Sequence, residues 1–149
     1  MKSAAHQKGF TLIELLVVIG ILAILFSIVL IAINPARQFN QANDTKRRSD
    51  TLQVLNAIHQ YAAENSGNLP TPLVKDYTAH DVANTGADLC TLLMPKYISA
   101  FPQDPSSNNG LPITSCAAYN TDYQVSVDAE GRVSVSAKDA ALGTISVTR

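Results

Sequence analysis

Residues 11–33 read TLIELLVVIGILAILFSIVLIAI, an apolar run in which Glu14 is the only charged residue. A helix of this length reaches roughly 35 Å at about 1.5 Å per residue, which is enough to cross the hydrocarbon core of a bilayer. The run is too long for the hydrophobic region of a secretory signal peptide, and residues 34–37 (NPAR) offer no small-residue cleavage site. The sequence therefore predicts a membrane-embedded helix over residues 10–34.

The charges that flank this run favour one orientation in the membrane. Lys2, His6 and Lys8 precede it, and basic flanking residues tend to stay in the cytoplasm. Arg37 and the basic run 46–48 on the far side argue against this orientation, with less weight. We expect a single-pass protein of the cytoplasmic membrane with a cytoplasmic N-terminus. The formal net charge of −1 gives no reason to expect direct binding of nucleic acid.

Residues 35–65 predict an amphipathic continuation of the same helix, so that one long helix would run from residue 10 to about residue 65. Its apolar stripe recurs at steps of three and four residues, as is typical of a helix lying on a domain. The stripe comprises Leu52, Leu55, Ile58 and Ala62, flanked by Val54 and Tyr61. The opposite, solvated face is expected to carry Lys46, Arg47, Asp50, Gln53 and Gln60.

Two helix breakers lie inside this predicted helix. Gly20 costs about 1 kcal/mol relative to alanine, and Pro35 removes a hydrogen bond to the carbonyl of Ile31 at about 3 kcal/mol. Pro35 favours a kink or break where the chain leaves the lipid. The alternative is that residues 20–35 form a stretch that unwinds when the protein is pulled.

The remainder of the chain, 66–149, predicts a small globular region. Residues 66–122 are rich in loops, with one short helix near Asp88–Pro95. Alternating apolar residues then predict strands at 123–127 and 133–137, joined by a turn, and a third strand that includes Ile145 and Val147. The expected fold is α+β, with a long N-terminal helix packed on a small C-terminal antiparallel sheet.

The stretch KGFTLIELL at 8–16 opens the apolar run and carries the clearest motif of the chain. It closely resembles the class III signal of type IV prepilins and type II secretion pseudopilins, and the resemblance covers residues 8–33. In that family a membrane peptidase cuts after the glycine on the cytoplasmic side and methylates the new N-terminal amine. By position, the resemblance implies a leader of residues 1–9, cleavage between Gly9 and Phe10, and methylation of Phe10.

The chemistry of these positions agrees with the resemblance. Gly9 has no Cβ, so the chain there can enter a narrow protease cleft. Cleavage would give Phe10 an α-amine with an ordinary pKa near 8, largely cationic at neutral pH. A carboxylate inside a membrane is costly unless it is paired, so Glu14 is expected to pair with the Phe10 amine of a neighbouring subunit. The alternative is that Glu14 only complements the N-terminus of its own helix.

The predicted function is therefore that of a structural subunit of a type IV pilus-like filament, serving adhesion, motility or DNA uptake. Its expected partners are further copies of itself, a prepilin peptidase, a membrane assembly platform and, before assembly, the lipid bilayer. The filament would be extracellular or periplasmic. A major pseudopilin of a type II secretion system is the first alternative, and a signal-anchored binding domain that does not polymerise is the second. No nucleophile with an adjacent base appears in the sequence, so we do not expect an enzyme.

Cys90 and Cys116 are the only cysteines, and both follow the membrane segment on its extracytoplasmic side. An even number in an oxidising compartment predicts one disulfide, which would close a loop worth roughly 3 kcal/mol. The resemblance agrees, because this family often fixes its C-terminal region with such a bond. Two free buried thiols are the alternative.

The stretch YISAFPQDP at 97–105 is similar to one found in secretion pseudopilins and some pilins. Because major pseudopilins bind calcium through a C-terminal loop, weak candidates for ligands are Asp104, Asn108, Asn109 and Asp122. Their spacing does not align with that site, so no cofactor is expected. His59 and His80 stand alone and predict solvated or half-buried side chains. The basic run 46–48 predicts a solvated face near lipid headgroups or an acidic neighbour.

Overall fold

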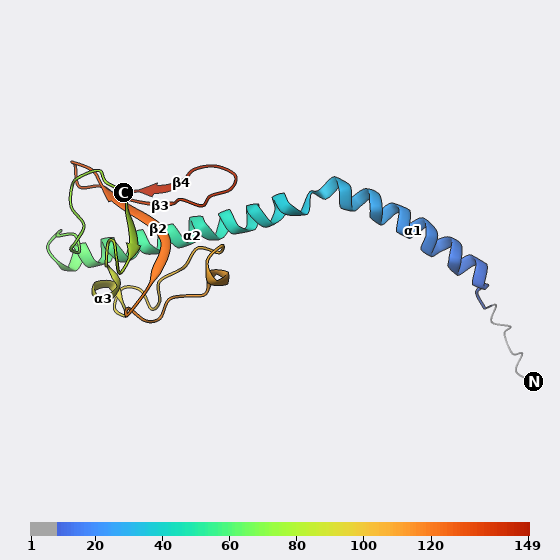
Figure 1. Ribbon diagram of the computed structural model, residues 1–149, viewed down its shortest axis with the longest axis horizontal. Helices are drawn as coiled ribbons and strands as arrows, with labels where there is room; N and C mark the ends of the chain where they lie inside the picture. Colours follow the sequence, from blue (N-terminus) through green and yellow to red (C-terminus); the bar gives the residue numbers. More distant parts are fainter. Residues whose placement is uncertain (1–8) are drawn as a thin grey trace, which may run out of the picture. The chain divides into compact units, whose positions relative to one another are not determined.

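The structure is a computed structural model that describes residues 9–149. The chain divides into two compact units, Met1–Gln38 and Phe39–Arg149, which we call the N-terminal and the C-terminal unit. Most of the predicted leader, including Lys2, His6 and Lys8, lies outside the described residues. The element order is α1, α2, β1, α3, η1, β2, β3 and β4 (Figure 1).

Helix α1 spans Leu12–Ile33 and has a mean hydropathy of 3.3 over its most apolar window. By length and composition it is the one described helix that can cross a membrane. None of its 22 residues is buried in the protein, and Gly20 lies within the helix without breaking it. A helix that is apolar on every side finds suitable surroundings only in lipid or among other apolar helices.

The predicted single helix is interrupted at Asn34, and this corrects the expectation of one helix from residue 10 to 65. Asn34 adopts a left-handed conformation (φ 46°, ψ 80°) that ends α1, and α2 begins at Pro35. The side-chain Oδ1 of Asn34 accepts a hydrogen bond from the backbone N–H of Arg37 at 3.3 Å. Pro35 therefore occupies the first position of a helix, where its missing N–H needs no partner and its usual penalty disappears. The interruption thus lies directly before Pro35, the residue at which the sequence favours a kink or break.

Helix α2 spans Pro35–Glu64, and its buried face differs from the predicted stripe. Leu55, Ile58 and Ala62 are buried as expected, but Leu52 is 42% exposed. The buried positions are Asp44, Arg47, Asp50, Thr51, Val54, Leu55, Ala57, Ile58 and Ala62. They follow the helical period through residues 47, 51, 54, 58 and 62. In the first half of α2 the buried positions are charged, so a pattern of apolar residues does not reveal them.

The sheet is antiparallel and has four strands in the order β1-β2-β3-β4. Their bounds are β1 His80–Ala83, β2 Asn120–Val127, β3 Val133–Ala137 and β4 Ile145–Thr148. The three predicted strands are confirmed, with Val125 opposite Val135 and Ala137 opposite Ile145. The sequence prediction missed β1, because the four-residue stretch HDVA is too short to show a clear alternation.

The core of the C-terminal unit lies between α2 and this sheet. Val54, Leu55 and Ile58 of α2 pack in one buried cluster with valines of β2 and β3. The long connection from β1 to β2 adds Leu89, Leu93, Phe101 and Tyr119 to the same cluster. This connection contains the short helix α3, Cys90–Leu93, in the predicted place, and the 3-10 turn η1, Asn108–Gly110.

The disulfide between Cys90 and Cys116 closes this connection, as predicted. Cys90 is fully buried at the start of α3, and Cys116 packs at the edge of the core. The hydroxyl of Tyr119 accepts the N–H groups of Leu89 and Cys90 at 3.0 and 3.3 Å and donates to Asp88 at 3.0 Å. The bond therefore links α3 to the end of an irregular connection, just before β2 begins.

A cluster of charges is buried where α2 meets two loops, and it corrects the predicted solvated face. Arg47 is 2% exposed, and its guanidinium donates to both carboxylate oxygens of Asp104, at 2.6 and 2.8 Å. It also donates to Asp44 at 2.9 Å. Asp50, predicted to be solvated, is buried and accepts the Tyr123 hydroxyl at 2.7 Å. The Arg47 charge is stable there because it is paired and hydrogen-bonded on several sides.

Candidate processing and assembly site

Gly9 and Phe10 precede α1 in an exposed, irregular stretch. The Phe10 side chain is 90% exposed. A Cβ added at Gly9 would meet no atom within 4 Å among the described residues, and the φ angle of Gly9 does not lie in the left-handed region. Within residues 9–149, therefore, nothing in the fold requires glycine at this position. A requirement for glycine would come from a molecule that binds the stretch.

Thr11 and Glu14 form a capping box at the start of α1. The backbone N–H and the hydroxyl of Thr11 both donate to Oε2 of Glu14 at 2.8 Å, and the Glu14 N–H donates to the Thr11 hydroxyl at 3.2 Å. This arrangement satisfies N–H groups that a helix start leaves without partners. It also holds the carboxylate at the first turn, where the helix dipole favours a negative charge.

The capping role of Thr11 was missed by the sequence prediction, which placed this residue in the motif without assigning it a function. The spacing Thr-x-x-Glu ahead of an apolar run is the signal that could have found it. The bonds to Thr11 use only Oε2 of the carboxylate. Glu14 therefore keeps one oxygen for a further partner while it caps its own helix.

The structure brings the predicted site residues to one end of an otherwise apolar helix. Gly9, Phe10 and Glu14 lie within the first six described positions, all of them exposed. After them α1 presents apolar side chains on all sides, including Phe26 and Ile31 at 64% and 82% exposure. Such an end can be cut in its extended part and can offer a carboxylate to a cationic partner.

The predicted calcium ligands do not form an oxygen cage in the structure. Asp104 is fully buried, and its oxygens accept from Arg47 and from the Ser106 N–H. Asp122 accepts from Ser107 at 2.5 Å and pairs with Lys138 at 3.2 Å. The carboxylates of Asp104 and Asp122 already have cationic or hydroxyl partners, so this arrangement does not favour calcium binding. Asn108 and Asn109 both lie within η1, and both have φ in the left-handed region.

Electrostatics explain why Asp104 and Asp44 stay ionised in the interior. Burial opposes ionisation of Asp104, but the Arg47 guanidinium and the Ser106 amide hold the pKa of this carboxyl below its usual range. Burial acts in the same way on Asp44, where the amides of Ala141 and Leu142, and then Arg47, lower the pKa. The hydrogen bond to Asp104 in turn raises the pKa of Arg47 despite its burial.

The two isolated histidines occupy different surroundings. His80 is partly exposed and lies 3.3 Å from Asp76. His59 on α2 is half-buried, and its Nε2 is enclosed without a hydrogen-bond partner among residues 9–149. Within the described part of the chain, no three His, Cys, Asp or Glu side chains gather in a way that could hold a metal ion.

Comparison with known protein families identifies the N-terminal segment. Residues 4–30 match the sequence family described as the prokaryotic N-terminal methylation motif. No curated protein and no solved structure matches the chain. The motif is the class III prepilin signal typical of type IV pilins and pseudopilins, which are generally non-enzymatic structural proteins. The helix packed against a four-stranded antiparallel sheet is a pilin-like α+β arrangement. The chain therefore carries the prokaryotic N-terminal methylation motif at the head of a pilin-like fold.

Proposed function

We propose that the protein is the precursor of a filament subunit. A prepilin peptidase removes residues 1–9 by cutting between Gly9 and Phe10, and the new amine of Phe10 is methylated. Residues 10–34 anchor the precursor in the membrane and later form the filament core. Residues 35–65 carry the globular region, 66–149, on the outside of the fibre.

The observation that carries this proposal is the helix α1 with the methylation motif at its head. Its 22 residues expose their apolar side chains on every side, so the chain leaves a surface that only lipid or other apolar helices can cover. A bundle of α1 helices from many copies would cover this surface after the precursor leaves the bilayer. An anchored domain that does not polymerise would need neither the motif nor the charge at Glu14.

Glu14 supplies the polar contact of the proposed assembly. In one chain its Oε2 is bonded to Thr11, and the other carboxylate oxygen is free to accept a hydrogen bond from the Phe10 amine of a neighbouring copy. Cleavage creates that amine, because the nitrogen of Phe10 is part of an uncharged peptide bond before it. Cleavage would therefore create the cationic Phe10 amine that is proposed to pair with Glu14.

Intact-mass spectrometry of fibres sheared from cells tests the proposal. We expect the mass of the chain from Phe10 onward, oxidised at Cys90 and Cys116 and carrying one added methyl group. The variant Gly9→Val should accumulate as uncut precursor in the membrane, whereas Gly20→Ala should be processed normally. Fibres whose subunits still contain residues 1–9, or a complete absence of fibres, would contradict the proposal.

A short pseudopilus of a secretion system is the second candidate. The stretch 97–105 favours it by resemblance, and in this fold the same stretch supplies buried Phe101 and Asp104 to the core and the charge cluster. Deleting the gene separates the two candidates. Loss of long surface fibres with normal secretion supports a pilus, whereas loss of protein secretion supports a pseudopilus.

A further inference from the structure

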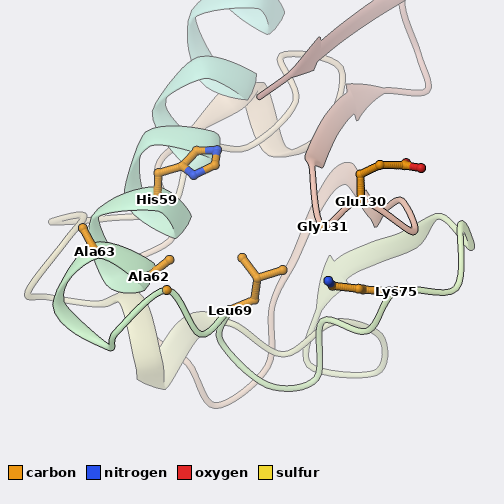
Figure 2. A pocket seen from close by; sticks show the side chains of 8 residues that line it. His59, Ala62, Ala63, Leu69, Lys75, Glu130 and Gly131 are labelled. Carbon is orange, nitrogen blue, oxygen red and sulfur yellow. The ribbon is translucent and has the colours of Figure 1, made fainter.

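A hollow of about 450 Å³ opens on the C-terminal unit between the last turns of α2 and the turn that joins β2 to β3 (Figure 2). Its apolar lining includes Ala62 of α2 and Leu69 of the following loop. This volume lies within the range of pockets that hold a small ligand or a few side chains.

Two nitrogen-bearing side chains point into this hollow from opposite sides. In Figure 2 the His59 ring and the Lys75 side chain face each other across Leu69, while the Glu130 carboxylate turns away. Lys75 lies across Gly131, where an added Cβ would come within 3.2 Å of its Cε and Nζ. Within residues 9–149 Lys75 forms no salt bridge, and the His59 Nε2 has no partner. The hollow therefore suits a carboxylate attached to an apolar group.

The same unit carries a projection with this chemistry, the loop of residues 138–144 between β3 and β4 (Figure 1). Asp139 is exposed and forms no salt bridge within the described part of the chain, and Lys138 beside it pairs with Asp122 and Asp81. Leu142 is 50% exposed. The loop thus presents one free carboxylate and one free apolar side chain.

The loop is held in place by a contact with α2. The backbone N–H groups of Ala141 and Leu142 donate to the Asp44 carboxylate at 3.1 and 2.8 Å. Asp44 is itself fixed by Arg47. A loop held in this way loses little conformational entropy when it binds, which favours its use as a contact surface.

We propose that the 138–144 loop of one copy docks into the His59–Lys75 hollow of another copy. Asp139 pairs with Lys75, with His59 as a second donor, and Leu142 covers Leu69. This inference rests on the proposed filament function and names a contact between its globular regions.

The positions of loop and hollow explain why the contact would join different copies. The loop is anchored on α2 at Asp44 and the hollow is lined by α2 at His59, so the two are about 22 Å apart along one rigid helix. A loop cannot reach the hollow of its own chain over that distance. Two different surfaces at separate places on one unit make a head-to-tail contact, which generates open helical filaments when its rotation does not close a ring.

Charge reversal in the full-length protein tests this contact, with fibre yield measured by quantitative electron microscopy. Lys75→Glu and Asp139→Lys should each reduce the yield at least tenfold, and the double variant should restore it to within about threefold of wild type. Asn56→Glu, which adds a charge at an exposed position of α2 that does not line the hollow, should leave the yield unchanged. Urea unfolding should confirm that all these variants keep the wild-type midpoint, since the altered side chains are exposed.

A cysteine pair tests the geometry independently. With Ala63→Cys and Leu142→Cys in one chain, mild oxidation of fibres should yield disulfide-linked multimers, whereas either single variant should yield no ladder. Single charge reversals that assemble like wild type, or a double variant that is no better than the singles, would overturn the docking inference while wild-type fibres keep the proposed function intact. If wild-type subunits form no fibres, both proposals fail.

Discussion

Helix α1 leaves all its side chains exposed, whereas the C-terminal unit buries its apolar residues and even an arginine. In α1 the polar bonds of side chains are confined to the capping box of Thr11 and Glu14. The C-terminal unit has a valine-rich core and a disulfide, and the charge of Arg47 is paired within the same chain. The C-terminal unit is thus stabilised by its own contacts, and α1 depends on surroundings that other molecules supply.

This difference separates changes that affect folding from changes that affect assembly. A substitution in the C-terminal unit should alter the stability of that unit and leave membrane insertion unchanged. A substitution at the head of α1 should leave the stability of the C-terminal unit unchanged and act only where copies meet.

The largest effect on folding is expected for Arg47→Ala. The change leaves the carboxylate of Asp104 fully buried without its counter-charge, which should lower the free energy of unfolding by about 3–5 kcal/mol. Urea unfolding of the full chain in detergent micelles, followed by tyrosine fluorescence, measures it. Arg48→Ala, one residue away but exposed, is the control and should stay within about 0.5 kcal/mol of wild type. Equal effects at both positions would contradict the buried charge cluster.

Loss of the disulfide should have the next largest effect. Cys116→Ser frees a connection whose ends lie 26 residues apart, which should lower the free energy of unfolding by about 3 kcal/mol. The same micelle assay measures this change, and limited proteolysis should locate new cuts between β1 and β2. Membrane insertion should be unaffected. An unchanged midpoint in urea would show that the bond does not restrain the unfolded chain.

Acid should have a smaller effect on the same unit. The folded-state pKa values of Asp104 and Asp44 lie below their ordinary values, so their ionised forms stabilise the fold above about pH 4. That contribution is lost as the pH falls through the folded-state values. The urea midpoint should therefore decrease from pH 5 toward pH 2.5. The decrease should be shallower in Asp44→Asn, and an identical slope would exclude Asp44 as a source.

The sequence predicted those features that depend on repeated local patterns. Alternating valines identified β2 and β3 and the side chains that face the core, and the length and hydropathy of the run at 11–33 identified α1. The two cysteines were sufficient to predict the disulfide. At the candidate site, the head of α1 was recognisable because its motif is contiguous.

The sequence did not predict features created by contacts between distant residues. From the sequence alone Arg47 is expected on the surface, because its partner Asp104 lies 57 residues further along the chain. No role was predicted for Asn34 from the sequence, although an asparagine directly before a proline often marks the end of a helix. Strand β1 is defined by its pairing with β2 rather than by its own residues. The 138–144 loop likewise gains its anchor from Asp44, almost a hundred residues earlier.

The claim that α1 acts in assembly rather than in folding is tested most directly at Glu14. The variant Glu14→Gln keeps the size and most hydrogen bonds of the side chain but removes the charge that would pair with a neighbouring Phe10 amine. Expressed as the only subunit, it should be inserted, cut and folded like wild type, because insertion becomes easier when a membrane carboxylate is removed.

Electron microscopy of sheared fibres, together with immunoblots of the membrane fraction, is the decisive measurement. We expect processed Glu14→Gln subunits in the membrane, an unchanged urea midpoint for the C-terminal unit and at least a tenfold loss of fibres. Wild-type numbers of fibres from Glu14→Gln subunits would contradict the account. In that case Glu14 would act only as the partner of Thr11 in capping its own helix.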